Sequence, residues 1–290
     1  MRPGRGRPGA TLPDRLPAAA AGAAAGRGEA LAPTGGRGVV RADLGRALPV
    51  DRRRLGGRLD RRTLGGDVGR VPRPGLRRSG QPPRGLWCNR VDEHSSILGG
   101  ALNDVGRAVS WLEATLRLPP ADELDAALAA DPAPGLPVVL PWFSGERSTG
   151  WVGEARGVFH RVSAATTPVE LYRATIEGVA LSYVRILREL IAVTGQPREI
   201  VATGHVAATL PSLLQMVADA VGVPVVPLTL KRSTLRGTAL STLPFLAPDA
   251  EAAPAPKGEP FVPHPDRLNY YHRRMERFGI LYDKVIAHAN

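Results

Sequence analysis

A glycine turn between a short apolar run and a helix is the part of this sequence best suited to ligand chemistry. The run Ile200–Ala202 is too short for a helix and is predicted to be a buried strand, which Thr203-Gly204 ends. A helical pattern from Thr209 to Gly222 and a second strand at Val223–Val226 follow. Backbone N–H groups at such a turn suit a phosphate. The plainer interpretation is a βαβ unit without a ligand, because one glycine is far less specific than a full glycine fingerprint.

The second candidate is the charged pair Glu146-Arg147, which lies on a polar loop near Trp142, Phe143 and Trp151. A charged pair on an aromatic loop could contact a substrate, or it could form an ion pair that holds the loop in place. We favour the structural role, because ion pairs in loops are common.

No other residues form a pattern typical of catalysis. Asp92, Asp104 and Asp125 could be nominated as bases, but none is paired with a histidine or with a second carboxylate. Their predicted roles are a strand end, a helix N-cap and an exposed helix face. The single cysteine, Cys88, excludes an internal disulfide and a cysteine-cluster zinc site, and it is compatible with a reducing cytosol.

The elements that would position these residues begin near residue 85. Strands are predicted at 86–91, 138–140 and 158–162, and helices from about 104, at 122–130 and at 168–194. The last is the longest, and it has clear boundaries: Thr167 as N-cap, Pro168 in the first turn and Gly195 at its end. Gly99-Gly100 is predicted to be a turn before the first helix.

Residues 1–84 have a different composition. They hold 19 arginines, no lysine and six acidic residues, a net charge of +13, whereas residues 85–290 have a net charge of −2. Arginine, glycine, alanine and proline make up 58 of the 84 residues, and no aromatic residue is present. Such a segment cannot bury enough apolar area to offset its conformational entropy, so we predict disorder or poor packing.

Three interpretations of residues 1–84 remain open. The first is a basic arm that binds nucleic acid, but such an arm would be expected to interleave arginine with aromatic residues, which this segment lacks. The second is a transit peptide, but transit peptides are also rich in serine, unlike this segment. A GC-rich gene read in the wrong frame gives this mixture of residues, and we favour that interpretation. The near-neutral remainder of the chain shows no nucleic-acid footprint. No run of 18 apolar residues is present, so no membrane-spanning helix is predicted.

Eight stretches between Leu86 and Leu243 resemble, in order and spacing, the C-terminal domain of the FGGY family of carbohydrate kinases. They are LWCNRVD, LGGALNDVG, LPWFSGERSTGW, EARGVF, PVELYRATIEGVAL, IVATGH, LLQMVADAVGVPV and RGTALSTL. The GGALND and IVATG stretches are most similar to gluconokinase-like members. The resemblance implies an α/β fold, namely the C-terminal domain of the actin-like ATPase (RNase H-like) fold, preceded here by a disordered or poorly packed N-terminal segment.

The resemblance also implies an activity and a nucleotide site. Family members transfer the γ-phosphoryl group of ATP to a hydroxyl of a sugar or sugar acid, with Mg²⁺ on the phosphates. The matching positions imply nucleotide-binding roles for Gly204, His205, Gln215 and Gly237. Gluconate is the first candidate substrate.

Two departures from the family bear on activity. His205 stands where a second glycine is usual, and its side chain could fill space that the phosphates need or strain the turn. The resemblance begins only at Leu86, and Asp51, Asp60 and Asp67 lack the apolar strand flanks of the family's catalytic base. We therefore assign no catalytic residue and no metal ligand, and we predict a fragment that lacks the base.

Two alternatives to a kinase remain: a non-catalytic pseudokinase or nucleotide-binding module and, least favoured, a nucleic-acid-binding protein that uses the arginine-rich arm. We expect a cytoplasmic protein that can self-associate, because half of a two-domain fold exposes an apolar face. The predicted division is a low-complexity segment at 1–84, a kinase C-terminal domain at 85–247, a Pro/Ala-rich linker at 248–262 and a C-terminal helix at 263–290.

Overall fold

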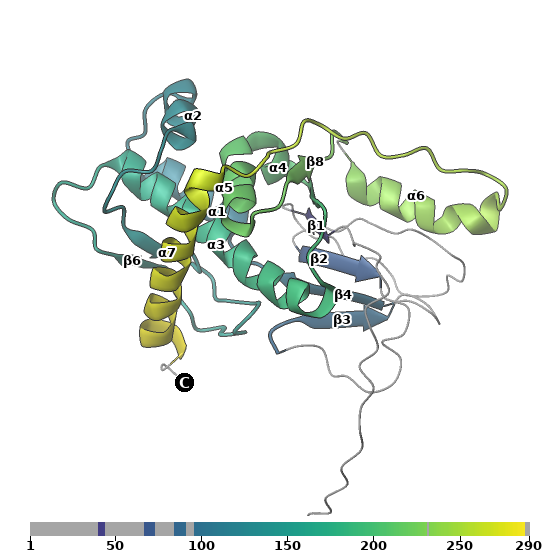
Figure 1. The fold of residues 1–290 in the computed structure, drawn as a ribbon, viewed down its shortest axis with the longest axis horizontal. Coiled ribbons are helices and arrows are strands. Elements are labelled where there is room, and N and C mark those ends of the chain that lie inside the picture. The colour runs from purple at the N-terminus through teal and green to yellow at the C-terminus, as the bar shows by residue number, and fades with distance from the viewer. Residues whose placement is uncertain (1–39, 44–66, 73–83, 91–95, 231, 288–290) are drawn as a thin grey trace, which may run out of the picture. The chain divides into compact units, whose positions relative to one another are not determined.

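The computed structural model describes residues 40–43, 67–72, 84–90, 96–230 and 232–287. These residues form a mixed sheet with helices around a long central helix (Figure 1). The strand order in the sheet is β3-β4-β2-β1-β7-β8. The strands are β1 (Val40–Asp43), β2 (Asp67–Pro72), β3 (Trp87–Arg90), β4 (Ser96–Ala101), β7 (Ile200–Thr203) and β8 (Val225–Pro227).

One half of this sheet is parallel and the other is antiparallel. Strand β7 pairs in parallel with both β1 and β8, whereas β2, β3 and β4 join through antiparallel pairs. The parallel half is the part of an α/β sheet whose strand ends form ligand sites. A second, two-stranded antiparallel sheet consists of β5 (Val138–Leu140) and β6 (Val158–His160).

Strands β1 and β2 lie inside the segment for which the composition predicts no globular structure. In the β1–β7 ladder, Ala42 pairs with Ala202, and in the β2–β4 ladder, Val71 pairs with Leu98. These two short stretches nevertheless pair with the sheet, because backbone pairing depends on neighbouring strands rather than on side-chain composition. The other residues of 1–84, apart from Arg84, lie outside the described residues.

Helix α3 (Pro168–Thr194) is set by local sequence, and its predicted boundaries are confirmed. Thr167 and Glu170 form a capping box: the Thr167 hydroxyl accepts from the Glu170 amide, and the Glu170 carboxylate accepts from the Thr167 amide. The helix ends at Gly195, which has φ +78°. Most of its residues from Tyr172 onward are buried, so α3 is the central helix of the core.

Two glycines allow α3 to lie close to its neighbours. A Cβ atom on Gly178 would lie 2.4 Å from the Val139 carbonyl oxygen of β5. A Cβ atom on Gly100 would lie 2.5 Å from a methyl carbon of Ile186. Gly100 belongs to strand β4, so the predicted Gly-Gly turn is wrong: the glycine is needed for close packing against α3, which sequence spacing does not reveal.

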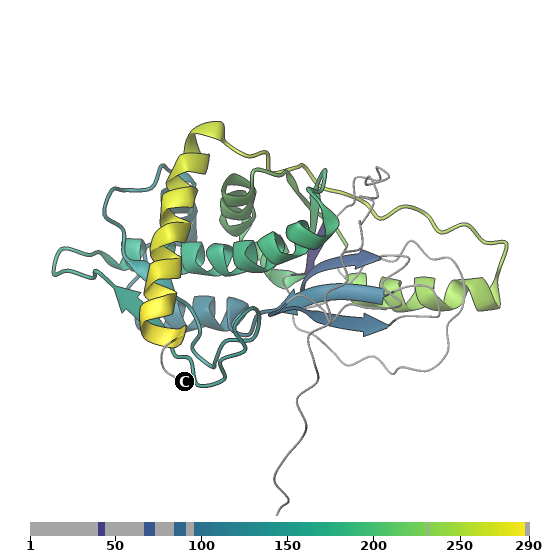
Figure 2. The same cartoon turned by 60° about the horizontal axis from the view of Figure 1, so that its bottom comes forward.

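The remaining helices surround α3. Helix α7 crosses α3 in both views (Figure 1, Figure 2) and packs against α5 and β5. Helix α5 begins one residue later than predicted, with Leu210 rather than Thr209 at the N-cap, and Gly222 ends it with φ +71°. The helices are α1 (Val105–Thr115), α2 (Ala121–Ala129), α4 (His205–Thr209), α5 (Pro211–Val221), α6 (Ser233–Leu246) and α7 (Pro265–Tyr282), which continues as a π-helical turn, η1 (Asp283–Ala287).

The predicted linker at 248–262 is partly attached to the sheet. Phe261 exchanges two backbone hydrogen bonds with Val225 of β8, and the Gly258 amide donates to the Pro227 carbonyl. This segment covers the free edge of β8, where unpaired backbone groups would otherwise be exposed. This segment and the C-terminal helix therefore contact the rest of the domain. The predicted division of the chain stays a prediction.

Among the helices in the described part of the chain, none combines the length and the apolar character needed to cross a membrane.

Candidate nucleotide site

The turn after β7 lies where the sequence places it. Strand β7 ends at Thr203, and Gly204 follows with φ +99°, a conformation that favours glycine. Helix α4 starts at the next residue, His205. The carboxyl ends of parallel strands are the usual ligand-binding edge of an α/β sheet. The geometry therefore offers a backbone turn that a ligand can approach closely.

His205 directly follows the turn glycine. Its side chain is exposed, and its carbonyl oxygen accepts a hydrogen bond from the Thr209 hydroxyl at 3.0 Å. The imidazole ring therefore faces solvent. The expectation that this side chain takes space needed by the phosphates stays a prediction.

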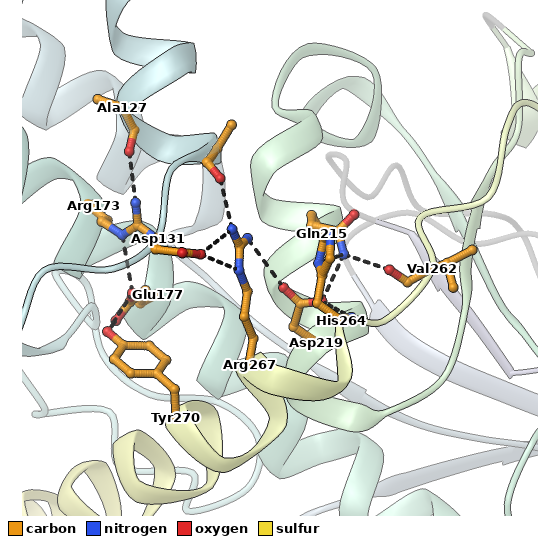
Figure 3. A network of polar contacts seen from close by, with 11 residues as sticks. Ala127, Asp131, Arg173, Glu177, Gln215, Asp219, Val262, His264, Arg267 and Tyr270 are labelled. Carbon is orange, nitrogen blue, oxygen red and sulfur yellow. Dashed lines mark hydrogen bonds and ion pairs between the residues drawn. The ribbon is translucent and has the colours of Figure 1, made fainter.

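Gln215 belongs to a different cluster. Its amide nitrogen donates to Asp219 Oδ1 at 2.8 Å and to the Val262 carbonyl at 2.9 Å (Figure 3). These two bonds use both amide hydrogens. The nucleotide-binding role of Gln215 stays a prediction, and the structure gives this side chain a task in holding the segment that leads into α7.

Asp219 is the centre of that cluster. It is fully buried on α5, and Oδ1 also accepts from the His264 backbone amide at 2.8 Å. The His264 Nδ1 atom lies 3.0 Å from Oδ1 and 3.1 Å from the Gln215 nitrogen. Which of these atoms donates depends on the tautomer of the His264 ring. Arg267 lies 3.8 Å from the other carboxylate oxygen.

A second buried carboxylate, Glu177 of α3, holds the middle of α7. Glu177 accepts from Arg274 Nε at 2.8 Å and from the Tyr270 hydroxyl at 2.9 Å. Arg173 Nε lies 3.5 Å from Glu177, and the NH1 atom of Arg173 donates to the Ala127 carbonyl of α2 (Figure 3). Glu177 and Asp219 therefore fix α7 at two points through charge-assisted hydrogen bonds.

These contacts change the titration of the tyrosines on α7. Burial, together with the Glu177 charge, raises the pKa of Tyr270. Burial also raises the pKa of Tyr271, and burial with the Glu146 hydrogen bond raises that of Tyr282. On α3, burial raises the pKa of Tyr172 to about 12. The folded state therefore retains phenolic protons that the unfolded chain releases near pH 10.

We expect an alkaline loss of stability from this difference. Below about pH 10 both states hold the protons, and the free energy of unfolding is unaffected. Above it the unfolded chain loses protons first, and each such tyrosine lowers the free energy of unfolding by up to about 1.4 kcal/mol per pH unit. Urea denaturation at pH 8, 9, 10 and 11 measures the slope, which Tyr270→Phe is expected to reduce. A urea midpoint that is constant to pH 11 would contradict this.

Glu146 forms an ion pair with a different partner than the sequence suggests. Its buried carboxylate accepts from Arg185 of α3 at 2.7 Å and from the Tyr282 hydroxyl at 2.7 Å. Arg147 is exposed, with its guanidinium carbon 5.7 Å from the centre of the Trp151 ring. The loop is held by Glu146, as the structural interpretation predicts, but Arg147 takes no part in that ion pair.

The start of α1 holds the other side of this loop. Asp104 accepts two hydrogen bonds from Ser144, from its amide and from its hydroxyl, both at 2.6 Å. The Ala101 amide donates to the Ser148 hydroxyl at 3.0 Å. Asp104 occupies the N-cap position of α1, but its side chain makes no capping hydrogen bond. The Asp104 side chain therefore does not cap α1 as predicted. It links the GGALND stretch to the loop instead.

Gly237 lies on α6 and is half-buried. The neighbouring Arg236 side chain donates to the Ala253 carbonyl. Leu235, Phe245 and Leu246 of this helix are all more than half exposed. The structure thus brings Gly204 and His205 together in one turn, whereas Gln215 and Gly237 lie on other elements, and the role of Gly237 stays a prediction.

Sequence reasoning missed Thr203 as a candidate. Its hydroxyl is buried, and no hydrogen-bond partner for it is found within the described residues. The sequence signal that could have identified Thr203 is its position directly before the turn glycine, Gly204. Asp43, at the end of β1, is the partner of Thr203 in the parallel ladder. Of the three aspartates rejected as bases, Asp67 begins β2, while Asp51 and Asp60 lie outside the described residues.

Comparison with known proteins gives a consistent result. Residues 79–243 match the model of the FGGY family of carbohydrate kinases, C-terminal domain. A glycerol kinase of Bordetella pertussis is 34% identical over 144 residues, which are 49% of this chain and 28% of that protein. A glycerol kinase of Myxococcus xanthus is 30% identical over 153 residues, which are 52% of this chain and 30% of that protein.

Solved structures agree in fold. The gluconate kinase of Lactobacillus acidophilus has a TM-score of 0.67 at 23% identity and covers 86% of this chain and 48% of its own. The xylulose kinase of Rhodospirillum rubrum has a TM-score of 0.63 at 25% identity and covers 76% of this chain and 46% of its own. The chain thus spans about half the length of these kinases, and its match spans less than a third of the curated relatives.

Proposed function

The chain belongs to the FGGY family of carbohydrate kinases, and we propose that it provides the nucleotide-binding half of such an enzyme. The reaction would transfer the γ-phosphoryl group of ATP to a hydroxyl of a sugar or sugar acid in the cytoplasm. The observation that carries this proposal is the Gly204 turn, which follows a parallel strand at the family's position and has φ +99°. A nucleotide phosphate can approach such a backbone closely.

Mg²⁺ would reach the site with the nucleotide. Within the described residues, no group of three or more His, Cys, Asp or Glu side chains is placed to hold a metal ion. A Mg²⁺ ion that is bound with a nucleotide is usually held chiefly by phosphate oxygens and water. Thr203 and Gly204 would then face the phosphates.

A non-catalytic nucleotide-binding module is the second candidate. The observation that favours it is that both Gln215 amide hydrogens bond to Asp219 and to the Val262 carbonyl, which leaves them unavailable to a nucleotide. Gluconate, glycerol and xylulose are the substrates to compare, since related kinases are named for them.

Calorimetry of the full chain with Mg·ATP tests the proposal, with phosphorylation of the three substrates assayed alongside. We expect Gly204→Ala to weaken ATP binding about tenfold or more, because a side chain at φ +99° strains the turn. The matched control is Gly195→Ala, which has a similar φ of +78° and open space around its Cβ position. Turnover supports the kinase, and binding without turnover supports the module. No binding by the unaltered chain would refute both.

A further inference from the structure

The Thr203 hydroxyl is the starting point, because the described residues give it no hydrogen-bond partner. Thr203 is 2% exposed, and its oxygen is buried. Buried polar groups in native proteins are nearly always paired, so an orphan requires an explanation. Arg173 Nε and Asp219 Oδ2 also lack a hydrogen bond, but each lies within ion-pair distance of an opposite charge.

The position of Thr203 points to a ligand. Ile200 and Ala202 line a small apolar cavity with α3 and α5 residues, so the alternation of a strand turns Thr203 to the opposite face. Thr203 is also the last residue of β7, at the ligand-binding edge of the parallel half-sheet. The next residue, Gly204, is half-buried, and His205 is exposed. The buried Thr203 hydroxyl therefore belongs to the residue directly before the point where the chain reaches the surface.

We infer that the Thr203 hydroxyl donates a hydrogen bond to a phosphate oxygen of a nucleotide bound at the Gly204 turn. The inference rests on the proposed function and adds a positioning residue to it. A phosphate oxygen is a charged acceptor, which makes the bond stronger than one between neutral groups. A ligand phosphate at the turn would thus form a hydrogen bond with the Thr203 hydroxyl, for which the described residues offer no partner.

Two substitutions separate binding from folding. Thr203→Val keeps the shape of the side chain and removes only the hydroxyl, whereas Thr203→Ser keeps the hydroxyl. We expect Thr203→Val in the full chain to raise the Kd for Mg·ATP and Mg·ADP about 10- to 100-fold. Thr203→Ser is expected to remain within about threefold of the unaltered chain, and binding of adenosine, which has no phosphate, is expected to be unchanged.

Urea denaturation without ligand gives the independent readout. An unpaired buried hydroxyl costs free energy, so the urea midpoint of Thr203→Val is expected to equal or exceed that of the unaltered chain. A lower midpoint would show that the hydroxyl has a structural partner and would overturn the inference. An unchanged ATP Kd, or an equal loss of adenosine binding, would also overturn it while leaving the proposed function intact. If the unaltered chain binds no nucleotide, both fail.

Discussion

Replacing Glu177 by alanine is expected to lower the free energy of unfolding by about 3–5 kcal/mol, the cost typical of removing one partner from a buried ion pair. Glu177 is fully buried, with Arg274 at 2.8 Å and Arg173 at 3.5 Å. Its removal leaves two buried guanidinium groups without their counter-charge. Arg274 also donates to the carbonyls of Leu136 and Pro137, so it cannot turn to solvent without losing those bonds.

The comparison variant for this prediction is Glu189→Ala. Glu189 is an exposed carboxylate on the same helix, so its removal is expected to change stability by about 0.5 kcal/mol or less. Urea denaturation followed by circular dichroism measures both variants. Glu177→Gln keeps the size and removes the charge, and an intermediate loss is expected. Equal costs for Glu177→Ala and Glu189→Ala would show that the buried pair contributes little.

Phe278→Ala is expected to lower the free energy of unfolding by a similar amount, about 3–5 kcal/mol, because it creates a cavity. Phe278 is fully buried on α7, and its ring centre lies 5.6 Å from that of Trp142 in an edge-to-face arrangement. Its removal takes away this aromatic contact and leaves space between α7 and the loop that follows β5. Helix α7 then keeps its charged contacts with Glu177 and Asp219 but loses part of its apolar contact with Trp142.

Ile280→Ala is the matched control for Phe278. Ile280 lies two residues away on the same helix and is 56% exposed, so its truncation is expected to cost about 0.5 kcal/mol or less. Urea midpoints give the difference in stability, and tryptophan fluorescence reports on the environment of Trp142. If Phe278→Ala proved as stable as the control, α7 would not be docked on the core as the structure describes.

Local sequence determines the helices most directly. The bounds of α3 follow from Thr167, Pro168, Glu170 and Gly195, and all four act within a few residues of the helix ends. The strand at β5 and the glycine end of α5 are likewise confirmed. Such signals are readable because capping bonds and side-chain periodicity depend only on near neighbours along the chain. The order and spacing of the eight family stretches likewise indicate the α/β fold and the family.

The tertiary structure alone decided which polar groups meet. Glu146 was next to Arg147 in sequence, yet its partner is Arg185, 39 residues away on α3. Gln215 matched a nucleotide-site position, yet its hydrogens serve Asp219 and Val262. The partner of a buried charge depends on which elements fold against one another, and that is set by the whole core rather than by adjacent residues.

The same distinction applies to the candidate site. The sequence by itself determined that a strand, a glycine turn and a helix would follow one another at 200–222, because each has a local signal. Only the tertiary structure placed that turn at the edge of a parallel sheet and buried the Thr203 hydroxyl where the described residues offer it no hydrogen-bond partner. A hydroxyl is ordinary in a sequence. Its burial is a property of the assembled sheet, and that property makes it a candidate for binding.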